Sequence, residues 1–189
     1  MLSLQTVNYL LALQVVALQA VTLALVALYL LRRRFADLND VGDFLGRWGL
    51  WVGFLATSAG SIITVVHSGI FHLPPCPLCW WQRAFLYPQV VLFALALYKR
   101  DTRTRGDERG DRTIADYSIA LSLVGLGIAL YHHALQMFPT GLLPCPAEGG
   151  VSCAQIFFLE FGYITYPMMA ITLFAFLIIL MLFVRRRGA

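Results

Sequence analysis

Five long apolar segments restrict the folds that this sequence can form. They are Val7–Leu31, Trp48–Ile70, Trp80–Tyr98, Ile114–Phe138 and Phe161–Val184. Each is about as long as the roughly 20 residues that a helix needs to cross a hydrocarbon core. Only 13% of the residues are charged, against about 25% in an average soluble domain. Disorder is therefore excluded, an ordinary soluble enzyme is not expected, and we predict a single all-α membrane domain over residues 1–189.

The basic residues predict the orientation of these helices. Thirteen of the 14 lie between the first and second segments, between the third and fourth, or after the fifth. The other connections, residues 1–6, 71–79 and 139–160, contain none. Because cytoplasmic connections of membrane proteins are enriched in Lys and Arg, we expect the N-terminus outside and the C-terminus in the cytoplasm.

The first segment has its positive charge after the apolar run, whereas a signal peptide has it before. We therefore expect a retained helix over residues 7–31, added to a bundle of four transmembrane helices over residues 48–184. Gln14 and Gln19 inside this first helix are predicted to form interhelical hydrogen bonds. On the second helix, a stripe of small residues is predicted to allow close helix packing. Its members are Gly49, Gly53, Thr57 and Ser61.

All four cysteines fall in two connections predicted to lie outside. They are Cys76, Cys79, Cys145 and Cys153. Three interpretations compete: two inert structural disulfides, a metal site, and a redox relay. Zinc sites usually combine two short Cys-x₂₋₄-Cys motifs, and the seven residues between Cys145 and Cys153 depart from that spacing. A Cys-x-x-Cys where a helix begins is typical of a reactive dithiol, which favours the relay.

The local sequence around the first pair supports the relay. Pro77 suits the first position of a helix, which places Cys76 at the N-cap and Cys79 in the first turn. Unpaired N–H groups at a helix N-terminus stabilise a thiolate there. Arg83 follows Cys79 by four residues, so both are expected on one helix face. It is the one basic residue away from the cytoplasmic side. The alternative is that Arg83 merely extends to the outer interface.

Residues 76–83 read Cys-Pro-Leu-Cys-Trp-Trp-Gln-Arg, and Tyr87-Pro88 follows. This motif resembles the disulfide bond formation protein B (DsbB) family, in the branch with a Cys-x-x-Cys-Trp-Tyr-Gln-Arg motif. The stretches 131–136 (Tyr-His-His-Ala-Leu-Gln) and 162–167 (Gly-Tyr-Ile-Thr-Tyr-Pro) are similar to the same branch. The resemblance covers about Trp48 to Val184, that is, four of the five expected helices.

The resemblance implies a four-helix membrane enzyme. It would take electrons from a thioredoxin-fold oxidase (DsbA-like) outside the membrane and pass them to a quinone, either ubiquinone or menaquinone. Cys76 and Cys79 would form the quinone-proximal pair, with Cys79 facing the quinone and Arg83 polarising a quinone carbonyl. Cys145 would form the mixed disulfide with the protein partner, and Cys153 would exchange with Cys76.

His132 is a further candidate for quinone binding or proton delivery, against the simpler role of an interfacial hydrogen-bonding group. Membrane lipid is an expected partner, nucleic acid is not, and the expected location is the bacterial cytoplasmic (inner) membrane. Two alternatives remain: an enzyme similar to vitamin K epoxide reductase, and a non-catalytic scaffold with two structural disulfides. The chain departs from the family in its extra first helix and its short spacer in the second loop.

Overall fold

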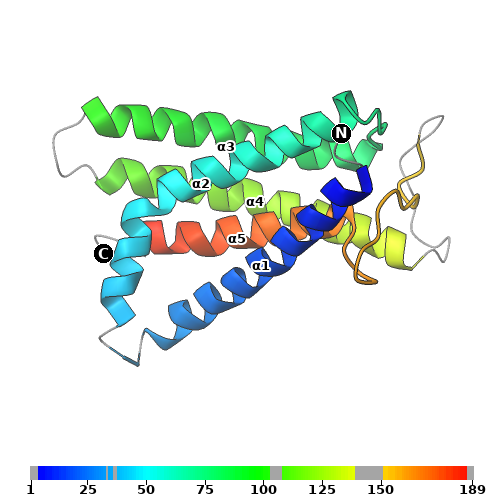
Figure 1. The fold of residues 1–189 in the computed structure, drawn as a ribbon. Coiled ribbons are helices and arrows are strands. Elements are labelled where there is room, and N and C mark those ends of the chain that lie inside the picture. Colours follow the sequence, from blue (N-terminus) through cyan, green and yellow to red (C-terminus); the bar gives the residue numbers. More distant parts are fainter. Residues whose placement is uncertain (1–3, 33, 36–37, 103–107, 139–150, 187–189) are drawn as a thin grey trace.

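The fold is all-helical, as predicted. The computed structural model describes residues 4–32, 34–35, 38–102, 108–138 and 151–186. Five helices follow one another along the chain (Figure 1): α1 (Leu4–Leu31), α2 (Leu38–Gly69), α3 (Pro77–Thr102), α4 (Glu108–Met137) and α5 (Tyr166–Arg186). Within these described residues there is no β-strand, and a single isolated bridge joins Glu160 to Ile164.

Four helices, α1, α2, α4 and α5, are long and apolar enough to cross a membrane. The chain is therefore a multi-pass membrane protein. The predicted span Trp80–Tyr98 is helical, but α3 is not among these four. It carries Gln82, Arg83 and Gln89, which lower its hydropathy. Gln82 and Gln89 are buried against α4, and Arg83 bonds α2, so neighbouring helices shield these polar side chains.

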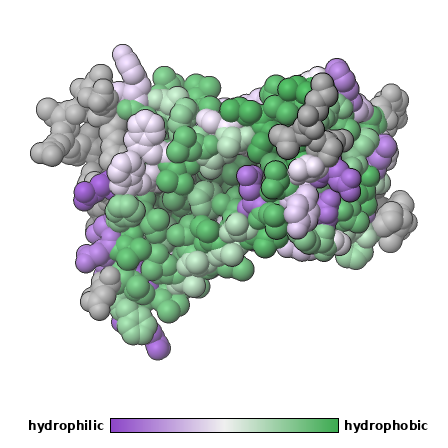
Figure 2. All heavy atoms as spheres, viewed as in Figure 1, coloured by the Kyte–Doolittle hydropathy of each residue, from purple (hydrophilic) through white to green (hydrophobic). Residues whose placement is uncertain are grey.

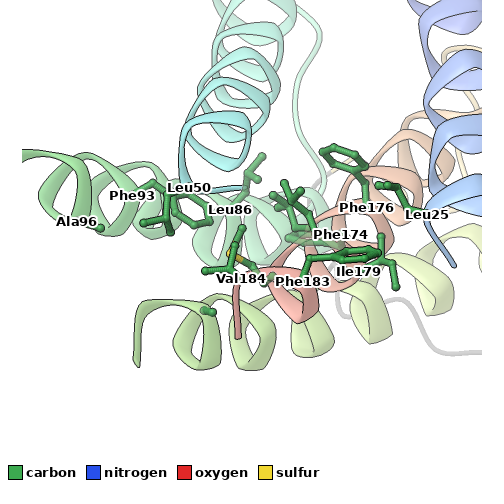
Figure 3. Close-up of a cluster of buried hydrophobic side chains, with 14 of the residues drawn as sticks. Leu25, Leu50, Leu86, Phe93, Ala96, Phe174, Phe176, Ile179, Phe183 and Val184 are labelled. Carbon is green, nitrogen blue, oxygen red and sulfur yellow. The ribbon is translucent and has the colours of Figure 1, made fainter. Parts of the chain in front are cut away.

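Helix α5 is the centre of the bundle. It packs against α4, α2 and α1, while α3 packs against α2 and α4. Figure 3 shows Phe174, Phe183 and their neighbours on α5 meeting Leu50 of α2 and Leu25 of α1. Apolar side chains also cover the middle of the face seen in Figure 2, whereas hydrophilic side chains gather toward its two ends. This distribution matches the hydrocarbon core and polar boundaries of a bilayer.

Small residues allow the close contacts between helices, as the stripe on α2 predicted. Gly49, Gly53 and Thr57 are all buried. On α4, Gly125 performs the same task, since a Cβ atom placed there would lie 2.5 Å from the Phe174 ring. Such a distance is far below van der Waals contact, so the α4–α5 interface depends on the absence of a side chain at this position.

The start of the fifth helix was predicted wrongly. Helix α5 begins at Tyr166, five residues after the expected start at Phe161. Phe161 and Gly162 have positive φ angles of 52° and 77°, which a helix does not accommodate. Residues 154–160, which precede this turn, are irregular rather than helical. Hydrophobic run length alone does not reveal such a turn.

The N-terminal end of α1 and the cysteine-bearing start of α3 lie at one end of the bundle (Figure 1). The C-terminal end of α5 lies at the other, where Arg185 forms an ion pair of 2.9 Å with Asp116 of α4. The five helices and the placement of the two chain ends at opposite ends of the bundle agree with the predicted arrangement. The side of the membrane to which each end belongs stays a prediction from charge.

Candidate redox site

Cys76 and Cys79 form a close pair at the start of α3. The helix begins at Pro77, so Cys76 occupies the N-cap position that the sequence predicted. The Trp80 N–H donates to the Cys76 carbonyl over 3.2 Å, and the Cys79 N–H donates to the Cys76 sulfur over 3.4 Å. Both cysteines are free, with their sulfur atoms 3.0 Å apart. The pair is a reduced dithiol poised to close into a disulfide.

His132 of α4 connects this dithiol to the second loop. Its side chain is only 2% exposed. The Gln82 amide nitrogen donates to Nδ1 over 3.0 Å, which leaves Nε2 as the protonated nitrogen. Nε2 lies 3.1 Å from the Cys153 carbonyl oxygen and 3.6 Å from the Cys76 sulfur. The Nε2–H group of His132 is therefore within hydrogen-bonding distance of both the Cys76 sulfur and the Cys153 carbonyl oxygen.

These contacts explain a low pKa at Cys76. A hydrogen bond from the Cys79 thiol lowers the pKa of Cys76 most, and burial of the sulfur opposes this effect. The hydrogen bond from His132 and its electrostatic interaction with the sulfur lower the pKa of Cys76 further, to about 4. Cys76 is therefore a thiolate at neutral pH, the form that attacks disulfides and other electrophiles.

Cys153 lies against the first pair. It is fully buried in one hydrophobic cluster with Cys76, Leu78 and Leu135. It is also disulfide-bonded, in contrast to Cys76 and Cys79. The structure thus brings a member of the second pair to the first, as exchange between pairs requires. Cys145 lies outside the described residues.

Arg83 lies one turn beyond Cys79 but its guanidinium turns toward α2. One nitrogen donates to the Thr64 carbonyl over 3.0 Å, and another approaches the Ser68 hydroxyl at 3.4 Å. The guanidinium carbon is 5.3 Å from the centre of the Trp80 ring, within the range of a cation–π contact. These contacts attach Arg83 to the last two turns of α2.

A cavity of about 430 Å³ connects these groups. Its walls come from α1, α2, α3, α4, α5 and the segment before α5, and they are mostly apolar. The polar residues of its lining include Cys76, Cys79, Arg83, His132 and Gln14. An apolar cavity of this size with a few convergent polar groups is typical of a small-molecule site.

Two contributions to this site were missed from the sequence. Gln82 was part of the quoted motif, but its hydrogen bond to His132 depends on how α3 and α4 pack. No role in this site was predicted for helix α1, yet it forms part of the cavity wall. Gln19 makes the predicted interhelical bond, to Thr172 over 3.2 Å, whereas Gln14 faces the cavity instead.

Cys76, Cys79 and His132 also have their ligand atoms within 4.8 Å of one another. A closed structural zinc site uses four protein ligands. The part of the chain that the structure describes supplies three at this point. The same three side chains already form the hydrogen bonds between the Cys76–Cys79 dithiol and His132 that are described above.

Known proteins similar to this chain carry related descriptions. The profile of the family described as "Disulfide bond formation protein DsbB" matches residues 46–184. A "Probable disulfide formation protein C 2" of Bacillus anthracis is 33% identical over 127 residues, 67% of this chain and 82% of that protein. A "Probable disulfide formation protein C" of Halalkalibacterium halodurans is 33% identical over 138 residues, 73% and 91% of the two chains.

A "Probable disulfide formation protein" of Chlamydia trachomatis is 37% identical over 119 residues, 63% of this chain and 78% of that protein. No solved structure matches the chain. The family match includes Cys76, Cys79, Arg83, His132 and Cys153, and leaves helix α1 outside it. From this match and from the paired cysteines at the end of a helix bundle, the chain belongs to the disulfide bond formation protein B family.

Proposed function

We propose that this protein, a membrane disulfide-forming oxidoreductase, carries two electrons from an extracytoplasmic thioredoxin-fold oxidase to a membrane quinone. One observation carries the proposal. The free Cys76–Cys79 dithiol borders an apolar cavity that also contains Arg83, while disulfide-bonded Cys153 packs against Cys76. Cys76 and Cys79 can therefore react with a lipid-soluble two-electron acceptor in the cavity, while Cys145 and Cys153 react with the dithiol of a protein partner.

The first half of the reaction is thiol–disulfide exchange. A thiolate of the reduced partner attacks Cys145 of the loop disulfide, and the partner's second thiol resolves the mixed disulfide. The partner leaves oxidised, and Cys145 and Cys153 are left as thiols. Cys153 then attacks Cys76 of an oxidised Cys76–Cys79 pair, and Cys145 resolves that bond. The loop disulfide forms again, and both electrons now lie in the Cys76–Cys79 dithiol.

The second half regenerates the Cys76–Cys79 disulfide. The pair gives up two electrons as its sulfurs join, and a quinone in the cavity accepts them together with two protons, one from the Cys79 thiol and one from water, to become a quinol. In sum, partner dithiol and quinone become partner disulfide and quinol. The free Cys76–Cys79 pair beside a disulfide-bonded Cys153 has the oxidation states expected immediately before this half.

The surrounding side chains have separate tasks in this scheme. His132 stabilises the Cys76 thiolate and keeps the backbone of Cys153 close to it. Arg83 donates a charge-assisted hydrogen bond to a quinone carbonyl, for which its hydrogen bonds to α2 already fix its position. The bilayer is the bacterial cytoplasmic membrane, with the cysteine end of the bundle outside and the C-terminus inside.

The test is oxidation of a reduced thioredoxin-fold oxidase by the purified full-length protein, followed with and without a soluble quinone. We expect catalytic oxidation that requires quinone and that forms one quinol per partner disulfide. A Cys145→Ser variant should lose this activity but still exchange with dithiothreitol through Cys76 and Cys79. A Cys153→Ser variant should lose it as well, because Cys145 then has no disulfide bond that the thiolate of the reduced partner can attack. Partner oxidation that proceeds at the same rate without quinone under anaerobic conditions would contradict the proposal.

A further inference from the structure

Helix α1 lies outside the region matched by the family but borders the cavity. Four of its residues line the cavity, namely Leu11, Gln14, Val15 and Leu18. Their spacing of three, four and seven residues places them on one face of the helix. The match to the family begins at residue 46. The cavity of this protein therefore has a wall that the shared four-helix core does not supply.

Specific contacts hold α1 in this position. Near its start, Asn8 is buried and its Oδ1 lies 3.4 Å from Nε2 of His67 on α2. Further along, the Gln19 amide donates to the Thr172 hydroxyl of α5 over 3.2 Å and accepts from the Tyr163 hydroxyl over 2.9 Å. These hydrogen bonds hold α1 against the bundle on both the N-terminal and the C-terminal side of Gln14. Figure 1 shows α1 crossing α5 at an angle to α2.

Gln14 is the polar residue of the cavity-lining face of α1. It lies about 14 Å along the helix axis from Gln5, the first residue of the apolar span. Its side chain is exposed and, among the residues that the structure describes, makes no hydrogen bond. An amide without a partner at this depth of a bilayer is unfavourable. A ligand with polar groups in the cavity would supply the missing hydrogen bond.

We propose that α1 forms the lateral wall of the quinone site and that Gln14 hydrogen-bonds the polar ring of the bound quinone. This inference rests on the proposed function. Arg83 can only donate hydrogen bonds, whereas an amide both donates and accepts. Gln14 therefore serves a quinone carbonyl before reduction and a quinol hydroxyl after it. It acts as a specificity-determining residue that the four-helix relatives do not need to share.

Two measurements on the full-length protein test this. A photoreactive azidoquinone is first bound and activated by light, and the labelled peptides are identified by mass spectrometry. We expect label on the α1 peptide that contains Gln14. Quinone kinetics are then compared for Gln14→Leu and for the matched control Gln5→Leu, which changes the same residue type on the same helix away from the cavity. Gln14→Leu should raise the quinone KM about three- to tenfold, the loss of one neutral hydrogen bond.

The outcomes separate this inference from the function on which it rests. If the unaltered protein neither reduces nor binds quinone, the proposed function itself is overturned. If it does both, but α1 carries no label and Gln14→Leu equals Gln5→Leu, only the role of α1 is overturned. If α1 is labelled but Gln14→Leu leaves the quinone KM unchanged, α1 lines the quinone site, and the proposed hydrogen bond from Gln14 is overturned. Unchanged exchange of Gln14→Leu with dithiothreitol verifies that the variant is folded.

Discussion

Cys76 differs chemically from a cysteine in a flexible loop because three groups converge on its sulfur. They are the Cys79 thiol, the Cys79 N–H and the Nε2 atom of His132. The first two follow from the position of Cys76 at a helix N-cap, which the proline after it made predictable. The third requires α4 to pack beside α3, so no local pattern in the sequence reveals it.

Replacement of His132 by Leu should raise the pKa of Cys76, because the Nε2 hydrogen bond and the electrostatic interaction that lower it are lost. In the reduced protein the thiolate should persist as the pH falls from about 9 toward about 4, and in His132→Leu it should disappear at a higher pH. Since the native state binds fewer protons than the unfolded state over this range, the thiolate's contribution to stability is also lost as the pH falls.

Thiolate absorbance near 240 nm, titrated against pH, measures the effect. His133→Leu is the matched control, because His133 bonds the Thr165 hydroxyl rather than a cysteine. Identical titration curves for the two variants would remove His132 from the Cys76 site.

The proposed contact of Arg83 with quinone depends on the shape of its side chain. Its planar guanidinium is fixed by the Thr64 carbonyl, and lysine cannot reproduce that geometry. Arg83→Lys should weaken apparent quinone affinity about ten- to a hundredfold, since a charge-assisted hydrogen bond is worth about 1.5–3 kcal/mol. Exchange with the protein partner should remain nearly intact. Steady-state quinone kinetics test this against Arg47→Lys, and normal kinetics in Arg83→Met would exclude Arg83 from the site.

The helices illustrate which features can be read from the sequence. Apolar length and the small-residue stripe predicted five helices and the packing face of α2. The start of α5 was missed because the turn at Phe161 and Gly162 interrupts an apolar run without any strong polar signal. Helix α3 was predicted as a span, but its polar side chains turn inward. Gln89, for example, is fully buried and bonds Ser118 and Ser122 of α4.

Packing of α4 on α5 predicts opposite results at two nearby glycines. In Gly125→Ala the new Cβ would meet the buried Phe174 ring, which should lower stability by about 1–3 kcal/mol. In Gly127→Ala the new Cβ has nothing within 4 Å, and the variant should be as stable as the unaltered protein or more so. Thermal unfolding in detergent distinguishes them. Equal transition temperatures would show that the α4–α5 contact is less close than described.

At the scale of the whole molecule, charge and cysteines separate to opposite ends. The sequence predicted this separation, because thirteen of the 14 basic residues and all four cysteines could be assigned to the segments between or after the expected helices. It could not predict the cavity, whose walls come from all five helices and the segment before α5. Nor could it place Gln14 and Arg83, far apart in the chain, on the walls of one chamber.

The predicted orientation can be tested with single cysteines in a variant that lacks the four natural ones. Ser152 and Asp43 are both exposed, the first in the segment before α5 and the second near the start of α2. A membrane-impermeant maleimide applied to intact cells should label Ser152→Cys and leave Asp43→Cys unlabelled until the membrane is permeabilised. The reverse pattern would place the redox site in the cytoplasm and contradict the orientation.

The central claim is that the Cys76–Cys79 dithiol passes its electrons directly to a quinone. In a protein whose loop pair is removed by Cys145→Ser and Cys153→Ser, the dithiol is reduced and mixed anaerobically with a soluble quinone. Quinone absorbance and free thiols are then followed together. Our account predicts one quinone consumed and two thiols lost per protein, with no reaction when Cys79→Ser is added. Thiols that persist while quinone stays oxidised, or normal quinone reduction by the Cys79→Ser protein, would contradict it.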